Sequence, residues 1–481
     1  MITRRSFLKA CAAAPLVAAL PSVAMATAVT PFPLTASKTK KRLVPGDRYQ
    51  DASVWAFNRS VPGPELRFKK GETLSVDFFN QLDEGSSVHW HGIRNINAMD
   101  GVAGLTQPEV MTDGQFRYEF PLKDSGTYWY HSHAKTWSQV ARGLYGPLIV
   151  EDESDPAVDQ DIVLMIDDWL LSDDGTIDEA SFGSLHDWSH GGRLGNWLTV
   201  NGQSHPTIDV PKNARIRLRL INAANARIFG LNIPASAFLI AEDGYPTPVQ
   251  PMQDVVLGPA QRADFIVDLG DTNITINETL NGGPYPAVTL NVIETNQSLV
   301  TKEILKQPTL ESPPTSIDVA IPLHMQGGAM GNLREAIFGG QLRPIRELAQ
   351  TYGKAWAFNG KIGEHHDHLA KINIGQAVSI EVWNDTRWNH AMHLHGHHFW
   401  IQTEDGEFLD GKRDTYLFQR GEKANLVFIA DNPGLWLFHC HMLTSCGRNG
   451  RSDRDLIKKA TQGWLFRTYC QSEDCFVVHL R

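Results

Sequence analysis

Four histidine pairs with the spacing His-x-His stand out in this chain, two in its first third and two near its end. In a β-strand, residues i and i+2 point to the same face, so each pair can present two imidazoles to one metal ion or one metal cluster. One such pair is a weak signal, but four of them indicate a shared metal centre. The pairs are His89/His91, His131/His133, His393/His395 and His439/His441.

A cysteine, Cys440, lies between the two histidines of the last pair. In a strand its side chain must point away from His439 and His441, toward a different metal. His390 precedes His393 by three residues and therefore tends to face the same way as Cys440. The pattern predicts a second, thiolate-containing metal site, joined to the first centre by one short piece of backbone.

A strand-like segment that ends in asparagine recurs three times. Segments 73–80, 214–222 and 377–384 read TLSVDFFN, ARIRLRLIN and AVSIEVWN. After the first and third, a His-x-His-Gly sequence begins nine residues beyond the asparagine, whereas the middle repeat has Leu231 there. Short β-rich runs punctuated by Gly and Pro are typical of β-sandwiches. We therefore predict an all-β protein of three Greek-key β-sandwich domains, with metal ligands in the first and third.

Composition sets the expected domain limits. Residues 151–159 are acidic and contain a proline, and residues 306–316 are rich in Pro and Ser, as linkers often are. The expected limits are 1–26 for an export signal, 40–152 for domain 1, 160–300 for domain 2 and 315–481 for domain 3, with an atypical tail at 444–481.

The N-terminus has the pattern of a twin-arginine signal peptide. Arg4 and Arg5 precede a short Ala-rich apolar run and the small-residue site Ala24-Met25-Ala26. The run is too short for a permanent membrane anchor, so we expect export by the twin-arginine machinery to a periplasm or out of the cell. The net charge of −10, without a basic cluster, argues against nucleic acid or anionic membranes as partners.

The order and spacing of HWHG, HSH, HxxHxHG and HCH resemble those of laccase-type multicopper oxidases over residues 40–443, and GPAQRADF at 258–265 resembles the family's middle domain. The resemblance implies cupredoxin-like domains and up to four copper ions, of type 1, type 2 and a binuclear type 3 pair. It also implies an oxidase that couples one-electron oxidation of a small reducing substrate, phenolic, aromatic or a metal ion, to four-electron reduction of O2 to water.

The family's ligand roles carry over position by position, so that each copper of the cluster would draw on domains 1 and 3 together. His89 and His393 would hold the type 2 copper, and His390 and Cys440 the type 1 copper. Asp100 matches an acidic residue near the type 2 copper that serves proton transfer, although an Asp-Gly turn also explains it. The type 3 pair would be held by His91, His131, His133, His395, His439 and His441.

The chain departs from the family after Leu443. Where the family has a second type 1 histidine and an axial ligand, this chain has Ser445 and Gly450. The tail 444–481 carries three of the five cysteines, a dense run of charges and only one strand-like stretch, 475–480. A frame shift near codon 444 is the simplest explanation, and an evolved variant with a modified or absent type 1 site is the other. We expect an incomplete type 1 site and weak turnover.

Other functions compete with a laccase-like oxidase. A copper-tolerance cuprous oxidase is less favoured, since the chain has only 10 methionines and no Met-rich insert. A non-enzymatic, exported copper-binding or scaffold protein would have lost the histidines, and a copper nitrite reductase needs fewer of them. His186, His190 and the cluster 365–368 are interpreted as loop residues. The natural substrate and the oligomeric state have no signature in the sequence.

Overall fold

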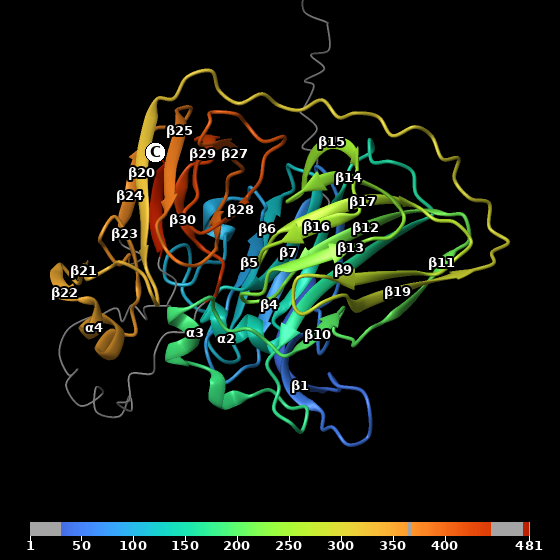
Figure 1. Ribbon diagram of the computed structural model, residues 1–481, viewed down its shortest axis with the longest axis horizontal. Helices are drawn as coiled ribbons and strands as arrows, with labels where there is room; N and C mark the ends of the chain where they lie inside the picture. The colour runs from blue at the N-terminus through green and yellow to red at the C-terminus, as the bar shows by residue number, and fades with distance from the viewer. Residues whose placement is uncertain (1–29, 364–366, 444–474, 481) are drawn as a thin grey trace, which may run out of the picture. The chain divides into compact units, whose positions relative to one another are not determined.

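The computed structural model of the chain describes residues 30–363, 367–443 and 475–480. The predicted signal peptide, most of the tail, and the histidines at 365 and 366 lie outside this part. All elements named below belong to the unit Pro31–Arg481. Figure 1 shows that strands dominate this unit, and its described residues form six larger sheets and one two-stranded sheet.

The first two sheets enclose one apolar core, to which Leu74, Phe78, Trp90 and Leu148 contribute. The sheets have the orders β2-β1-β4-β6 and β3-β8-β7-β5. Their strands are β1 (Phe32–Lys41), β2 (Ala52–Phe57), β3 (Leu66–Lys69), β4 (Thr73–Asn80), β5 (Val88–His91), β6 (Gln115–Pro121), β7 (Gly126–Ser132) and β8 (Tyr145–Glu151).

The second pair of sheets, with the orders β10-β9-β12-β17-β14-β15 and β11-β19-β18-β13-β16, encloses another core around Leu218, Phe229 and Phe265. Its strands are β9 (Gln160–Trp169), β10 (Trp197–Val200), β11 (Thr207–Pro211), β12 (Arg215–Asn222), β13 (Phe229–Asn232), β14 (Ser236–Glu242), β15 (Tyr245–Pro251), β16 (Asp254–Leu257), β17 (Arg262–Asp268), β18 (Ile274–Glu278) and β19 (Tyr285–Ile293).

The third pair has the orders β23-β20-β25-β29-β27 and β24-β31-β30-β26-β28, around Ile380, Trp436 and Phe438. The tail strand β31 lies between β24 and β30, with Val477 and Val478 buried. The strands are β20 (Val319–Gly327), β23 (Trp356–Phe358), β24 (His368–Ile372), β25 (Ala377–Asn384), β26 (His390–Leu394), β27 (Trp400–Thr403), β28 (Thr415–Phe418), β29 (Lys423–Ile429), β30 (Gly434–Cys440) and β31 (Cys475–Leu480).

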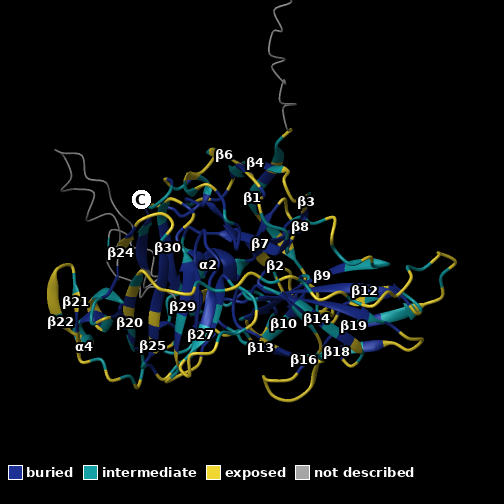
Figure 2. Cartoon of the chain, turned by 90° about the horizontal axis from the view of Figure 1, so that it is seen from above, coloured by how far each residue is buried: buried dark blue, intermediate teal, exposed yellow. Residues whose placement is uncertain are grey.

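The remaining elements are short. Buried residues gather along the strands, and exposed residues along the connecting loops (Figure 2). Within the described ranges, no helix has the length and apolar character needed to cross a membrane. The short elements are η1 (Asn97–Met99), α2 (Thr136–Gln139), η2 (Val140–Arg142), η3 (Glu179–Ser181), α3 (Leu185–Ser189), α4 (Ile345–Glu347), η4 (Leu348–Tyr352), and the hairpin β21 (Glu335–Phe338) and β22 (Gln341–Pro344).

The three repeated asparagines occupy equivalent places in the three sandwiches. Each ends a strand, β4, β12 or β25, that pairs in parallel with the first strand of its own sandwich, β1, β9 or β20. In each, Oδ1 accepts the backbone N–H of the residue two positions on, and Nδ2 donates to two backbone carbonyls. The internal repeat seen in the sequence is therefore a repeated structural corner, made by Asn80, Asn222 and Asn384.

Candidate metal centre

The eight histidines of the four His-x-His pairs lie together inside the protein, although they come from opposite ends of the chain. All eight side chains are buried. Their ring nitrogens form three groups, and within each group the donor atoms lie within 4.8 Å of one another. The groups are His89, His91 and His393; His91, His131 and His441; and His133, His395 and His439.

Two matching pairs of antiparallel strands position these residues. In the first sandwich, β5 and β7 place His89 opposite His131. In the third, β26 and β30 place His393 opposite His439. Side chains alternate along a strand, so the two histidines of a pair reach the same side. Every group therefore takes ligands from both sandwiches.

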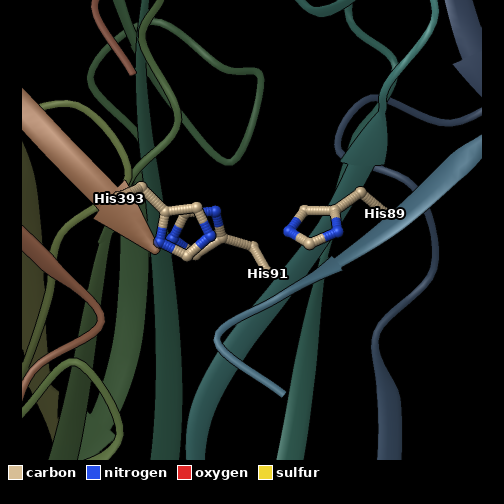
Figure 3. A group of neighbouring side chains, drawn as sticks. All are labelled: His89, His91 and His393. Atoms are coloured by element: carbon tan, nitrogen blue, oxygen red, sulfur yellow. The ribbon is translucent and has the colours of Figure 1, made fainter. Parts of the chain in front are cut away.

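The first group brings its rings into close contact. The His91 and His393 rings stack with centroids 3.8 Å apart, and the His89 ring points toward them (Figure 3). Within the described part of the chain, Nε2 of His89, Nε2 of His393 and Nδ1 of His91 are buried without a hydrogen-bond partner. Buried polar atoms are costly unless something binds them, so this group fits a metal ion.

In the third group, two nitrogen lone pairs face each other. His395 donates from Nδ1 to a carboxylate oxygen of Asp100 at 2.9 Å, and His439 donates from Nδ1 to the Cys440 carbonyl at 3.1 Å. In the neutral rings both Nε2 atoms then carry lone pairs, and these atoms lie only 3.0 Å apart. Two lone pairs at this distance repel each other, so the geometry fits a bound cation.

Burial keeps most of these imidazoles in the form that binds metals. Desolvation lowers the pKa of six of them well below the ordinary value, and neighbouring histidines lower it further. A neutral imidazole has a free lone pair for a metal, whereas the protonated form has none. The six are His91, His131, His133, His393, His395 and His441.

Asp100 follows η1 directly and is fully buried. Its carboxylate contacts Nδ1 of His395 at 2.9 Å and Nδ1 of His89 at 3.3 Å, and its carbonyl accepts from His89 Nδ1 at 2.8 Å. The expected Asp-Gly turn is present as well, since Gly101 has φ of 82° and a Cβ there would lie 1.8 Å from the Val88 carbonyl oxygen. Asp100 thus orients one histidine from each sandwich.

Asp414, which no sequence motif marks, orients two more histidines. Its Oδ1 lies 3.1 Å from Nε2 of His91, and its carbonyl accepts from Nδ1 of His393 at 2.8 Å. The Thr415 hydroxyl is a second partner of His91 Nε2, at 3.1 Å. These contacts leave Nδ1 of His91 and Nε2 of His393 to face the metal group. Such outer contacts fix the orientation of ligand rings.

Arg262 connects the second sandwich to this centre. It begins β17, inside segment 258–265, and its buried guanidinium donates to both oxygens of Asp414 at 2.8 and 2.5 Å. Asp243 lies 3.3 Å from the same guanidinium, and burial raises the pKa of Asp243 to about 8. The second sandwich contains none of the predicted ligands, but through Arg262 it helps to position them.

His390 and Cys440 meet at a separate site in the third sandwich. Nδ1 of His390 lies 3.4 Å from Sγ of Cys440. Burial lowers the pKa of His390 to about 4, so the ring is neutral near pH 7. Positions 445 and 450, where further ligands are expected in the family, lie outside the described residues. The structure thus brings the predicted imidazole of His390 and the predicted sulfur of Cys440 together.

A cavity lies beside this pair. Its lining combines aromatic and sulfur-containing side chains with one histidine from the second sandwich. His190, expected in a loop, directly follows α3 and lines the cavity, and its ring stacks on that of His186 with centroids 4.1 Å apart. Besides Cys440 and His390, the lining includes Met325, Trp356, Phe358, Met442 and His190.

Comparison with known proteins gives a consistent result. Family models described as multicopper oxidase match residues 38–155, 160–280 and 342–448. The multicopper oxidase MmcO of Mycobacterium tuberculosis is 28% identical over 425 residues, which cover 81% of this chain and 80% of that protein.

Two solved structures extend this similarity to the fold. A multi-copper oxidase from Pseudomonas thermotolerans superposes with a TM-score of 0.76 at 27% identity, over 94% of this chain and 99% of that one. Lac15, from a marine microbial metagenome, gives a TM-score of 0.69 at 36% identity, over 87% of this chain and 98% of that one. The predicted all-β fold of three cupredoxin-like Greek-key sandwiches is confirmed, and the chain belongs to the multicopper oxidase family.

Proposed function

We propose that this protein is a laccase-like, copper-dependent oxidase that couples one-electron oxidation of a phenolic, aromatic or metal-ion substrate to four-electron reduction of O2 to water. One observation carries the proposal: eight buried histidines direct ring nitrogens into shared groups between the first and third sandwiches. Several of these nitrogens have no partner among the described residues, which is unfavourable for a protein without metal.

The grouping supports one assignment of the coppers. We assign the type 2 copper to His89 and His393, and the type 1 copper to His390 and Cys440. We assign each type 3 copper to one group of three histidines, and each group contains residues of both sandwiches. One triad is His91, His131 and His441, and the other is His133, His395 and His439.

Bound copper would supply one-electron redox chemistry and a site for O2. The protein's own residues orient the ligands and shield them from solvent. Asp100 and Asp414 each hold two rings so that the remaining nitrogens face inward. Asp100 is also a buried carboxyl in contact with two ligands, which suits it to proton transfer. His439-Cys440-His441 joins the thiolate to one histidine of each type 3 triad.

The type 1 site limits the expected activity. Two donors are close together, but Ser445 and Gly450 replace the usual further ligands. We therefore propose that the cluster binds copper and that electron supply from the substrate is weak. The tail strand β31 inside the third sandwich favours a tail that belongs to the fold.

The genetic code is also compatible with a frame shift. Asn449-Gly450 is encoded by AAY-GGN, and read one nucleotide later the codon AAT gives ATG for methionine, whereas AAC gives ACG for threonine. Continued through Asp455, the same shifted frame can read Met-Val-Gly-Leu-Ile-Val-Ile. This sequence would supply a methionine and an apolar strand where the family has an axial ligand and a closing strand. Resequencing the 3′ end of the gene distinguishes the two explanations.

We further propose that the mature protein is exported by the twin-arginine machinery. The support comes from Arg4 and Arg5, the short apolar run and Ala24-Met25-Ala26 in the sequence. A fusion of residues 1–30 to a reporter tests this proposal, and replacement of both arginines by lysine should stop export.

The decisive experiment is copper stoichiometry with a visible spectrum and O2 consumption on copper-loaded mature protein. Cluster copper without intense blue colour, and slow O2 consumption, would support the proposal. Protein without stoichiometric copper would contradict it and indicate a scaffold. Cu(I) oxidised faster than a phenol would favour a copper-tolerance role. If a repaired C-terminus also fails to give four-electron O2 reduction, the oxidase proposal is wrong.

A further inference from the structure

The asparagine corner of the third sandwich differs from the other two in one residue. In all three corners the asparagine Oδ1 accepts the N–H of the residue two positions on. That residue is Leu82 in the first sandwich, Ala224 in the second and Thr386 in the third. Only Thr386 adds a hydroxyl group. Its Oγ1 lies 2.7 Å from Asn384 Oδ1 and 2.9 Å from Nε2 of His390.

The orientation of this hydroxyl is set by its neighbours. The Asn384 amide is fixed, because Nδ2 donates to the carbonyls of Trp388 and Gln419 at 2.8 Å. Its Oδ1 therefore faces Thr386 and can only accept a proton. The Trp388 N–H points at the same hydroxyl oxygen, at 3.2 Å. The Thr386 hydroxyl donates to Asn384 Oδ1 at 2.7 Å or to the Trp388 carbonyl at 3.0 Å, and either bond leaves a lone pair for His390 Nε2.

A lone pair on Thr386 requires a proton on Nε2 of His390. A neutral imidazole carries one ring proton, so Nδ1 of His390 must then be unprotonated. This atom faces Cys440 Sγ at 3.4 Å, on the side where a metal would bind. Trp356 packs edge-on against the ring, with centroids 5.0 Å apart and planes at 84°, and limits its rotation.

We propose that Thr386 is a positioning residue for the type 1 copper: its hydroxyl, fixed by Asn384, holds His390 in the Nε2–H tautomer and so directs the Nδ1 lone pair toward a metal beside Cys440. The proposal rests on the proposed function, since it treats His390 as a ligand. The hydroxyl occurs in the repeat whose corner lies next to a thiolate site, and the equivalent Leu82 and Ala224 offer none.

The first test needs no metal. In metal-free protein labelled with ¹⁵N-histidine, the NMR resonances that disappear in the variant His390→Gln are those of His390. We expect these resonances to show an unprotonated Nδ1 and a protonated Nε2. Thr386→Val removes the hydroxyl at nearly constant volume and should give a mixture of tautomers, whereas Thr386→Ser should keep the wild-type pattern. Thr199→Val is the matched control, because it removes another buried hydroxyl, which accepts from Trp169 Nε1 at 2.9 Å.

The second test uses cobalt(II) alone as a probe, followed by its thiolate absorption band, which Cys440→Ser should abolish. Thr386→Val should weaken cobalt binding by about 10- to 100-fold, as loss of an outer contact to a ligand histidine does, and Thr386→Ser should restore it. A proton on Nδ1 in the wild type, no response to Thr386→Val, or no recovery in Thr386→Ser would overturn the proposal. If Thr386→Val does not fold, the wild-type and Thr386→Ser spectra still decide the tautomer.

The two tests also separate this proposal from the proposed function. Wild-type protein with copper in the histidine cluster but no cobalt–thiolate band would contradict the type 1 assignment and the metal role of Thr386, and the oxidase cluster would stand. Loss of cluster copper with an intact cobalt–thiolate band would contradict the proposed oxidase, while the histidine resonances would still support the role of Thr386.

Discussion

The histidine cluster and the Cys440 site differ in how widely their parts are distributed. The cluster combines histidines of the first and third sandwiches, and Asp100 and Asp414 orient them. Arg262 of the second sandwich in turn holds Asp414. The Cys440 site brings together two side chains of one sandwich, His390 and Cys440, and the positions where the family has its further ligands follow Leu443. Under the proposed function, a change confined to that segment would stop electron supply and leave the histidine cluster intact.

The largest expected effect comes from removing a cluster ligand. His395→Asn deletes one member of the group His133, His395 and His439 and leaves Asp100 without its 2.9 Å partner, while His390 and Cys440 are untouched. We expect loss of type 3 copper and O2 consumption at the level of the protein-free reaction, measured by metal analysis and an oxygen electrode. Unchanged copper content would mean that His395 is not a ligand.

The next effect tests the contribution of the ligand-free sandwich. Arg262→Met leaves the buried carboxylate of Asp414 without its cation, and should lower the free energy of unfolding by about 3–5 kcal/mol. Denaturant titration measures it, with Lys423→Met as control, since Lys423 and Glu404 form an exposed pair. If Arg262→Met and Lys423→Met lowered the free energy of unfolding by the same small amount, Arg262 would not support the cluster.

Acid should destabilise the metal-free protein. Burial lowers the pKa of His390 to about 4 and lowers the pKa of six cluster histidines well below its ordinary value, so below about pH 6.5 the unfolded chain binds protons that the folded chain does not. The contribution of each neutral buried histidine to the free energy of unfolding is present above the pKa that histidine has in the unfolded chain. It is lost as the pH falls, by about 1 kcal/mol per histidine between pH 7 and 5.5. His390→Gln should reduce the loss by about that amount in paired unfolding titrations. An unchanged loss would contradict neutral burial of His390.

The smallest effect should come from Cys440→Ser. If electron supply is already impaired, this variant should lose any thiolate–metal absorption, keep its cluster copper and change O2 consumption little. A large loss of turnover would show instead that the tail rebuilds a working type 1 site, and the contrast between the two sites would disappear. The spectrum, copper content and oxygen uptake of one preparation decide between these outcomes.

The clustering of the histidine pairs was predictable because it follows short-range rules. Strand alternation places the two histidines of each pair on one side, and the repeated asparagines mark equivalent corners. These two signals, with the family resemblance, led to the three sandwiches and the histidine cluster. The division of the eight histidines into three groups was not predicted, because it depends on the distance between strands of different sandwiches.

The outer contacts were less accessible from the sequence. Asp414 lies far along the chain from its partner His91, and a single buried acid before a strand has no distinguishing local pattern. Thr386 is an ordinary turn residue unless the asparagine corners are compared. Long-range hydrogen bonds of this kind depend on tertiary packing, which spacing rules do not encode.

Because each group takes histidines from the first and third sandwiches, bound copper would join the two ends of the chain. A metal ion that binds only when the two sandwiches are in contact adds its binding free energy to their association. Chelation should therefore loosen this interface before either core melts, and amide exchange should rise first in β5, β7, β26 and β30. The copper supply would then determine how strongly the first and third sandwiches associate, as well as whether the protein can react with O2.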